Sequence, residues 1–263
     1  LRRYTHTLDA ITIPEFFSKR FHDRRNILSL IAAVIIIVFF IPYTASGFAA
    51  CGKLFASLFG VNYVGAMIVS AIVIVGYTAA GGFLAASITD FIQSIIMTIA
   101  IFAILAFATA TAGGIGAVVD NVKSMSGYLS LTNSYDPATN TSTSYNLLHI
   151  ITTVSWGLGY FGMPHILLRF MAISDPDELK KSRRIASVWV VISMAIAILI
   201  GVVGYSLMTA GIVGPYASNS EAETIIVDIS RYISGFGFIP SFVAGIFISG
   251  ILASTMSTAD SQL

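Results

Sequence analysis

Hydrophobic residues in this chain form long runs that contain no charged side chain, and short polar segments separate the runs. Each run can hold the roughly 20 apolar residues that a helix needs to cross a bilayer. The pattern therefore predicts six membrane-spanning helices, over about residues 27–50, 63–80, 89–111, 147–172, 185–210 and 240–263.

The composition supports a membrane protein. Of the 263 residues, 56% are hydrophobic and 10% are charged, and the mean hydropathy is +0.85; soluble domains carry far more charge. The net charge of +1 gives no sign of nucleic-acid binding. The single cysteine, Cys51, rules out an internal disulfide and a cysteine-based metal site. Because Leu1 is not a methionine and Leu263 lies inside an apolar stretch, we expect one transmembrane domain, residues 1–263, truncated at both ends.

Basic residues are unevenly distributed over the two sides that six alternating spans define. One side carries eleven of the fourteen, and the other carries Lys53, Lys123 and Arg231. Because Lys and Arg are enriched in cytoplasmic loops, we expect the N-terminus inside and the polar loop over 115–145 outside, with a short helix at 116–125. Residues 15–21 form an amphipathic stretch that suits a helix at the membrane surface.

The predicted fourth span is interrupted. Residues 155–169 read SWGLGYFGMPHILLR, with three glycines and a proline inside an apolar segment. Glycine weakens a helix, and proline removes a backbone donor and clashes with the preceding turn. Broken backbone at membrane depth is tolerated only where it is buried in protein or lines a cavity. We therefore expect a binding site here, and interpret the segment as the centre of a transporter domain.

Trp156, Tyr160 and Pro164 follow one another at intervals of four, which places them on one face if the segment stays helical. An aromatic ring with a hydroxyl beside freed carbonyls would suit a small amphipathic solute. Packing is the alternative, since Trp and Tyr are common at membrane interfaces. His165, beside the break, is expected to be a hydrogen-bonded structural residue.

Hydroxyl side chains are concentrated near the end of the sixth span. Ser254, Ser257, Thr258 and Ser261 fall at i, i+3, i+4 and i+7, which makes one continuous oxygen-bearing face. Sodium is a hard cation that prefers oxygen ligands, so this face is a candidate sodium site. The alternative is that each hydroxyl bonds the preceding turn of its own helix.

Asp90 is the single charged residue between Lys53 and Asp120. An ionisable residue in or near a span is a functional hypothesis by default, although this position close to the cytoplasmic end also suits a hydrated carboxylate. The sequence shows no nucleophile–base arrangement and no metal-ligand spacing, so we do not expect an enzyme.

Several motifs together resemble the sodium/solute symporter family, and within it the proline-transporting branch. They are WGLGYFGMPHI at 156–166 with RFMA at 169–172, FIPYTASG at 40–47, GGFLAASITDFIQ at 81–93 and GILASTMST at 250–258. The resemblance covers the whole chain in the same order.

The resemblance implies an all-α integral membrane protein with the leucine-transporter-type inverted-repeat fold, of which this chain would supply core helices three to eight. It also implies roles for particular residues: solute binding by Tyr43, Trp156, Tyr160 and Pro164, sodium binding by the side chains of Ser257 and Thr258 and the backbone carbonyl of Ser254, and sodium coupling by Asp90.

By the same resemblance, we expect a multi-pass protein of the bacterial inner membrane that imports proline with sodium by alternating access. Two residues depart from the proline branch: Met163 stands where glutamine is usual, and Asp260 where a small polar residue is usual. A symporter for another small organic solute and the membrane sensor of a histidine kinase are the alternatives. A channel is less favoured, because a broken helix beside an ion-binding face indicates an occluding site.

Overall fold

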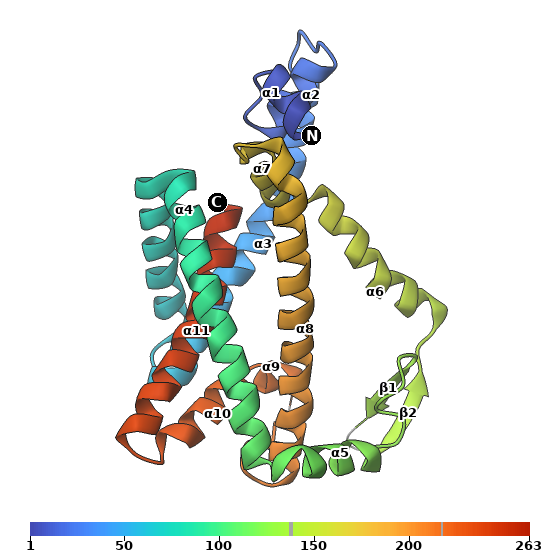
Figure 1. Cartoon of the computed structure of the whole chain (residues 1–263), viewed down its shortest axis with the longest axis vertical. Coiled ribbons are helices and arrows are strands. Elements are labelled where there is room, and N and C mark those ends of the chain that lie inside the picture. Colours follow the sequence, from blue (N-terminus) through green and yellow to red (C-terminus); the bar gives the residue numbers. More distant parts are fainter. Residues whose placement is uncertain (137–138, 217) are drawn as a thin grey trace. The chain divides into compact units, whose positions relative to one another are not determined.

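The computed structural model describes residues 1–136, 139–216 and 218–263, and helices make up almost all of it. The first half contains α1 (Arg2–Thr7), α2 (Ile13–Arg20), α3 (Ile27–Phe59), α4 (Tyr63–Thr111), α5 (Gly114–Ser124), β1 (Asn133–Asp136) and β2 (Thr141–Ser144) (Figure 1). The second half contains α6 (Leu147–Gly159), the 3-10 turns η1 (Tyr160–Gly162) and η2 (Pro176–Glu178), α7 (Pro164–Ala172), α8 (Leu179–Thr209), α9 (Asn219–Ala222), α10 (Ile225–Ser234) and α11 (Phe238–Gln262). The predicted all-α class is confirmed.

The helices form two compact units. One unit comprises Leu1–Tyr43, Ser144–Val190 and Gln262, and the other comprises Thr44–Thr143, Val191–Ser261 and Leu263. We call them the break unit, because it holds the interrupted segment α6–η1–α7, and the carboxylate unit, because it holds Asp90 and Asp260.

In the break unit, the short helices α1 and α2 pack against α7. The side chain of Thr12 caps α2 by accepting a hydrogen bond from the Glu15 backbone N–H, and Pro14 occupies the first turn, where its missing N–H costs nothing. Arg2 links α1 to the chain after α7 by donating from Nε to the carbonyl of Ile173. The predicted surface helix over 15–21 is therefore present, beginning two residues earlier.

The carboxylate unit has a continuous apolar core where the second half of α4 meets α5, α8, α10 and α11. Its most deeply buried side chains are Ala108, Ala100, Ile104, Leu207, Ile229, Ile233 and Phe247. The small alanines on α4 allow the neighbouring helices to approach closely, as is usual between membrane helices. A second, smaller cluster joins α3, the first half of α4 and α11 through Cys51, Ile74 and Ala259.

Among the described residues, four helical segments are long and apolar enough to cross a membrane: Ile27–Phe59, Tyr63–Thr111, Pro176–Thr209 and Phe238–Gln262. The six predicted spans correspond to α3, the two halves of α4, the α6–α7 segment, α8 and α11. The predicted second and third spans are the two helical halves of α4, which meet at a kink at Gly82, whose φ of 61° and ψ of −163° are open to glycine alone. The predicted fourth span is divided between α6 and α7.

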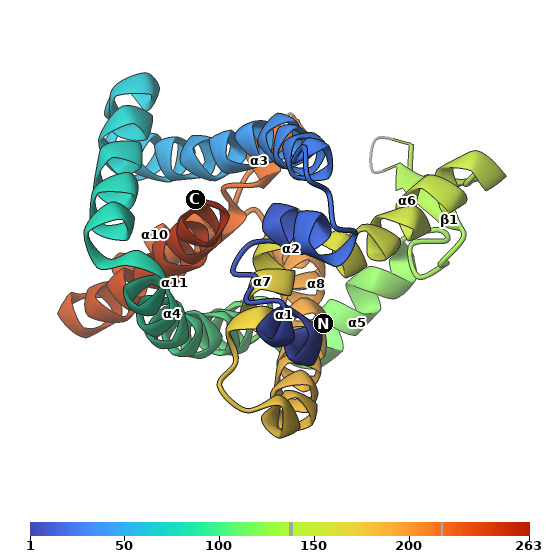
Figure 2. The same ribbon diagram turned by 90° about the horizontal axis from the view of Figure 1, so that it is seen from above.

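The Gly82 break turns the chain sharply, so the second half of α4 runs back from the end of the first half (Figure 1). The end of α11 is enclosed by α3 and the two halves of α4 (Figure 2).

The polar loop over 115–145 contains more structure than we expected. The short helix is present as α5, but β1 and β2 pair in a two-stranded sheet that the sequence did not predict. Each strand has only four residues, rich in Ser, Thr and Asn. Such short polar strands lack the apolar alternation that identifies a strand in sequence. Residues 137, 138 and 217 of the predicted loops lie outside the described residues.

Candidate functional site

The interruption in the predicted fourth span is real and falls at the glycine and proline positions. Helix α6 ends at Gly159, η1 covers the next three residues, Met163 is extended with ψ of 116°, and Pro164 is the first residue of α7. The carbonyl of Met163 accepts from the backbone N–H groups of Ile166 and Leu167 and so starts the new helix. The break therefore leaves carbonyls at the end of α6 and the His165 N–H at the start of α7 outside the regular helix bonding pattern.

The aromatic residues of the break lie close together and open to the outside of the unit. The rings of Trp156 and Tyr160 are 6.4 Å apart, and the two residues are 71% and 49% exposed. No residue of α6 is buried. The predicted shared face of Trp156 and Tyr160 is thus preserved, although Pro164 lies beyond the 3-10 turn and not on the same continuous helix.

Tyr43 lies in the same unit, on α3, and contacts the residue that follows Pro164. Its ring is 6.3 Å from the His165 ring, and the Phe40 ring is 5.7 Å from His165 and 5.9 Å from Tyr43, so the three rings form one cluster. The structure therefore brings Tyr43 to the start of α7. The hydrogen bond that we expected for His165 is not found at Nδ1, which is buried without a partner among the described residues. Ring packing, and not hydrogen bonding, holds this imidazole.

On α11 the predicted hydroxyl face is present. Ser257 Oγ donates to the Ser254 carbonyl at 3.2 Å, and Thr258 Oγ1 donates to the same carbonyl at 2.9 Å. These are the bonds to the preceding turn that formed the alternative explanation. A hydroxyl that donates its proton in this way keeps its lone pairs for a cation, so the geometry fits sodium ligation by Ser257 and Thr258. The Ser254 carbonyl oxygen already accepts both of these hydrogen bonds, so it could bind the ion only in addition to them or in place of one of them.

Asp90 is not simply hydrated. Its Oδ2 accepts a hydrogen bond of 3.0 Å from Ser261 Oγ, the last hydroxyl of the same α11 face. The structure therefore joins two features that the sequence places 171 residues apart. A carboxylate and a row of hydroxyls at one helix end make a donor set suited to a hard monovalent cation.

A second carboxylate belongs to Asp260, the residue before Ser261 on α11. Asp260, 3% exposed, accepts a hydrogen bond of 2.8 Å from Tyr77 Oη in the first half of α4. Sequence reasoning noted Asp260 as the carboxylate among the hydroxyls of the sixth span and as a departure from a family pattern, but it missed Tyr77. A buried carboxylate requires a hydrogen-bond partner, so the acid in an apolar helix was a signal that some donor must face it. Nothing in the sequence indicated which donor.

Two close approaches hold α11 in place. A Cβ on Gly250 would lie 2.4 Å from the Ala100 Cβ, and a Cβ on Gly47 would lie 3.3 Å from the Ala259 Cβ. Only glycine at position 250 allows α11 to approach α4 so closely. These contacts fix the turn of α11 that carries Ser257, Asp260 and Ser261.

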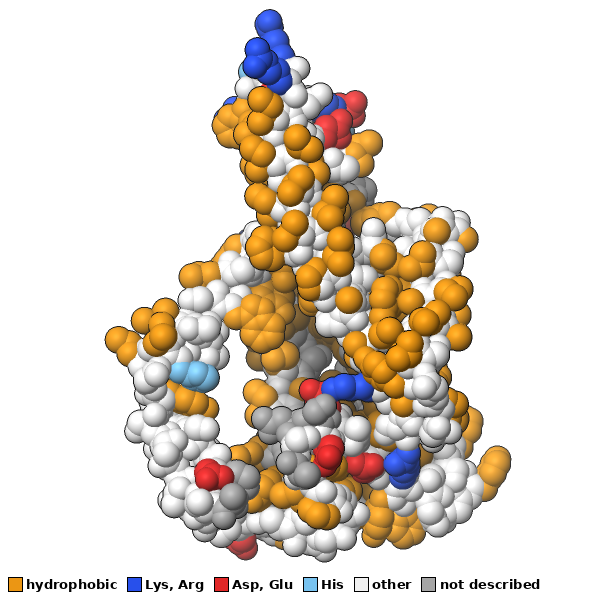
Figure 3. Space-filling model, turned by 180° about the vertical axis from the view of Figure 1, so that it is seen from behind, with side chains coloured by type: hydrophobic (Ala, Val, Ile, Leu, Met, Phe, Trp, Pro, Cys, Tyr) orange, Lys and Arg blue, Asp and Glu red, His pale blue; other side chains and the backbone are white. Residues whose placement is uncertain are grey.

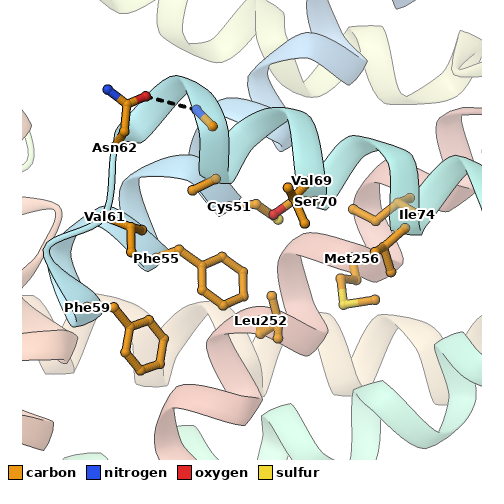
Figure 4. A pocket seen from close by; sticks show the side chains of 13 residues that line it. Cys51, Phe55, Phe59, Val61, Asn62, Val69, Ser70, Ile74, Leu252 and Met256 are labelled. Carbon is orange, nitrogen blue, oxygen red and sulfur yellow. Dashed lines mark hydrogen bonds between the residues drawn. The ribbon is translucent and has the colours of Figure 1, made fainter.

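The carboxylate unit also has an apolar cavity of about 720 Å³ between α3, the first half of α4 and α11 (Figure 4). Phe55, Phe59, Leu252 and Met256 point into it. No charged side chain lines it, and its one amide, Asn62, is occupied in capping the Gly65 N–H at 3.0 Å. An amino acid carries two charges that need partners, so this cavity does not suit an amino-acid substrate.

The fold and the two sites together define a multi-pass α-helical membrane protein of the transporter type: a broken helix with aromatic side chains, and a carboxylate–hydroxyl cluster on a second helix. The chain belongs to the sodium:solute symporter family, whose family model matches residues 1–263. Membership in this family identifies a transporter chain and not an enzyme.

Curated relatives agree with this family. The chain is 39% identical over 270 residues to the sodium/proline symporters of Staphylococcus aureus strains USA300 / TCH1516, JH9 and NCTC 8325 / PS 47, covering 100% of this chain and 48% of each relative. The chain therefore spans about half the length of the curated relatives it matches. No solved structure gives a significant match.

Proposed function

We propose that the full product of this gene is a sodium-coupled symporter that imports proline by alternating access. The observation that carries the proposal is the carboxylate–hydroxyl cluster in a chain of the sodium:solute symporter family: Ser261 donates to Asp90, beside Ser257 and Thr258. The 39% identity to sodium/proline symporters supports proline as the substrate.

For the solute, we propose that Trp156 and Tyr160 supply an aromatic surface for the apolar ring of proline. The Tyr160 hydroxyl can also donate a hydrogen bond to the carboxylate of the solute. Carbonyls at the end of α6 accept from the positively charged amine of proline, and the His165 N–H at the start of α7 donates to its carboxylate, since a helix N-terminus favours anions. Pro164 fixes the first turn of α7, and Tyr43 supports that turn through His165.

For the ion, we propose that Ser257 and Thr258 bind sodium through their hydroxyl oxygens, with the Ser254 carbonyl as a further ligand. Asp90 supplies the compensating negative charge. It is linked to the hydroxyl face by the hydrogen bond from Ser261. A monovalent cation held by neutral hydroxyls alone would be weakly bound, whereas a nearby carboxylate attracts it directly, and this attraction is strong in a medium of low dielectric constant.

For the coupling of ion and solute, the proposal rests on the hydrogen bonds of two carboxylates, Asp90 and Asp260. Tyr77 lies before the Gly82 break and Asp90 lies after it, and α11 contacts both through Asp260 and Ser261. We propose that sodium binding on α11 favours one angle at the Gly82 break, and that this angle accompanies the outward-open state. Such coupling must be reciprocal: the solute has to tighten sodium binding by the same factor.

The remaining features belong to the same proposal. We propose residence in the inner membrane of a bacterium, with the N-terminus in the cytoplasm. We also propose that this chain supplies core helices three to eight of a leucine-transporter-type inverted repeat, with the two halves of α4 and the α6–α7 segment acting as separate spans.

The test is uptake of labelled proline by vesicles that contain the full gene product, with an imposed sodium gradient and with potassium in place of sodium. Accumulation that depends on sodium is the expected result. Uptake of a different solute with sodium would keep the symporter and change the substrate. No sodium-dependent uptake, with protein present in the membrane, would favour the sensor alternative and refute the proposal.

A further inference from the structure

A second cavity lies in the break unit, between α2 and the beginning of α3. It has a volume of about 500 Å³, with Ser18, Lys19, Asn26 and Ser29 on its polar side and Leu30 and Ala33 on its apolar side. Immediately beside it begins the exposed apolar surface of α3, where Ile27 is 49% exposed and Leu30 is 64% exposed. An apolar helix surface needs lipid around it, so the cavity lies at the level where α3 enters the bilayer.

The polar side of this cavity has donors to offer. Ser18 is 9% exposed, and its Oγ has no hydrogen-bond partner among the described residues. Glu15, the one acidic side chain in the lining, is already engaged: Lys19 contacts it at 2.8 Å and the Ile11 N–H donates to it at 2.9 Å. The hydrogen bond from Lys19 lowers the pKa of the Glu15 carboxyl, so the carboxylate is stabilised where it is.

The surroundings of the cavity are positively charged. The break unit contains eleven basic residues and six acidic ones. Asp23 is held by the backbone N–H groups of Arg25 and Leu28, at 3.1 and 2.6 Å. Arg20, Arg24 and Arg25 are exposed, and no ion pair within the described ranges involves them. Figure 3 shows Lys and Arg side chains over α1 and α2, next to a column of hydrophobic side chains.

We propose that this cavity binds the headgroup of an anionic phospholipid from the leaflet that contacts α2. The phosphate accepts hydrogen bonds from Ser18 Oγ and the Asn26 amide, Lys19 stays paired with Glu15, and Arg20, Arg24 and Arg25 supply the surrounding positive field. One acyl chain follows Leu30 and Ala33 along α3. A basic rim, unpartnered donors and an apolar floor in one cavity match a phosphate that carries an acyl chain, and they do not match a soluble anion. This inference does not depend on which solute the protein transports.

The experiment places the purified full gene product in nanodiscs of phosphatidylcholine, with and without phosphatidylglycerol, and measures retained lipid by native mass spectrometry and the thermal unfolding midpoint. We expect selective retention of phosphatidylglycerol. Each of the substitutions Arg20→Gln, Arg24→Gln and Arg25→Gln should weaken retention of phosphatidylglycerol about fivefold at low salt. A basic side chain near an anionic membrane surface contributes about that factor to binding. Ala33→Leu should displace the acyl chain without changing charge.

Two matched variants control the result. Ala32→Leu adds the same side chain one position away, outside the cavity lining, and should retain phosphatidylglycerol as the wild type does. Lys123→Gln removes an exposed charge on α5 and should also have no effect. Equal retention of both lipids, equal effects of Ala33→Leu and Ala32→Leu, or a loss in Lys123→Gln as large as that of one arginine would each overturn the proposal. Stabilisation by soluble glycerol phosphate in phosphatidylcholine discs would also overturn it.

Discussion

The break at α6–α7 and the end of α11 carry the two halves of the proposed function, and they are built in opposite ways. Trp156 is 71% exposed and α6 buries no residue, whereas Ala259 and Asp260 on α11 are 0% and 3% exposed. The α11 residues are positioned by packing and by hydrogen bonds to both halves of α4. Side chains around the ion should therefore contribute to both binding and stability, and side chains around the solute to binding alone.

The largest effect should come from Asp90→Asn. The substitution removes the negative charge that compensates the ion and keeps the size of the side chain. We expect about a 100-fold loss of sodium affinity, the upper end of the range seen when outer partners of a metal ligand are changed. Sodium dependence of uptake, measured from low to high sodium, gives the apparent affinity. Tyr77→Phe, which leaves Asp90 in place, should have a clearly smaller effect; an equal effect would contradict the role given to the Asp90 charge.

Gly250→Ala should destabilise the protein. The added Cβ would lie 2.4 Å from the Ala100 Cβ, so α11 must move away from α4. Overpacking of this kind costs about 1–3 kcal/mol in free energy of unfolding. The thermal unfolding midpoint in detergent reports the loss. Gly245→Ala is the matched control on the same helix, because no atom lies within 4 Å of its added Cβ; similar midpoints for the two variants would refute the close approach.

Tyr160→Phe should separate binding from stability. The ring stays and the exposed hydroxyl is lost, so we expect proline affinity to fall by about tenfold, the equivalent of one hydrogen bond of about 1.4 kcal/mol. The unfolding midpoint should not change, because nothing in α6 is buried. Proline competition and a melting curve on the same preparation check both statements. A large drop in midpoint would show that α6 is packed in the full protein and would weaken the comparison.

The smallest effect should come from Lys53→Gln. Lys53 pairs with Glu223 at 2.6 Å, with side chains 44% and 62% exposed. Exposed ion pairs contribute about 0–1 kcal/mol and are screened by salt. We expect a small decrease in unfolding midpoint that disappears at high ionic strength. A decrease that persists in high salt would mean that the pair is more buried than this chain alone shows.

The sequence predicted the fold class and the location of the break, because both depend on local chemistry: uncharged apolar runs, and glycine and proline at 157–164. It also predicted that the second span ends at the Gly81–Gly82 pair, but not that Gly82 alone turns the chain, since a Gly-Gly pair equally suits a short loop between two helices. It also missed β1 and β2, whose few polar residues carry no periodic signal.

For the site, the sequence predicted which residue types matter but not their partners. The hydroxyl face followed from a spacing of three and four residues within one helix. The bonds from Ser261 to Asp90 and from Tyr77 to Asp260 join residues 171 and 183 positions apart, and no local pattern encodes them. Long-range contacts of this kind come from packing, here from the close approach at Gly250.

The central claim is that an ion site on α11 and a solute site at the α6–α7 break are energetically coupled. The most direct test measures binding of labelled sodium to the purified full gene product with and without saturating proline, and binding of proline with and without saturating sodium. The account predicts that each ligand tightens the other by the same factor, and that Thr258→Ala weakens sodium binding. Sodium affinity that proline does not change, or that Thr258→Ala leaves intact, would contradict it.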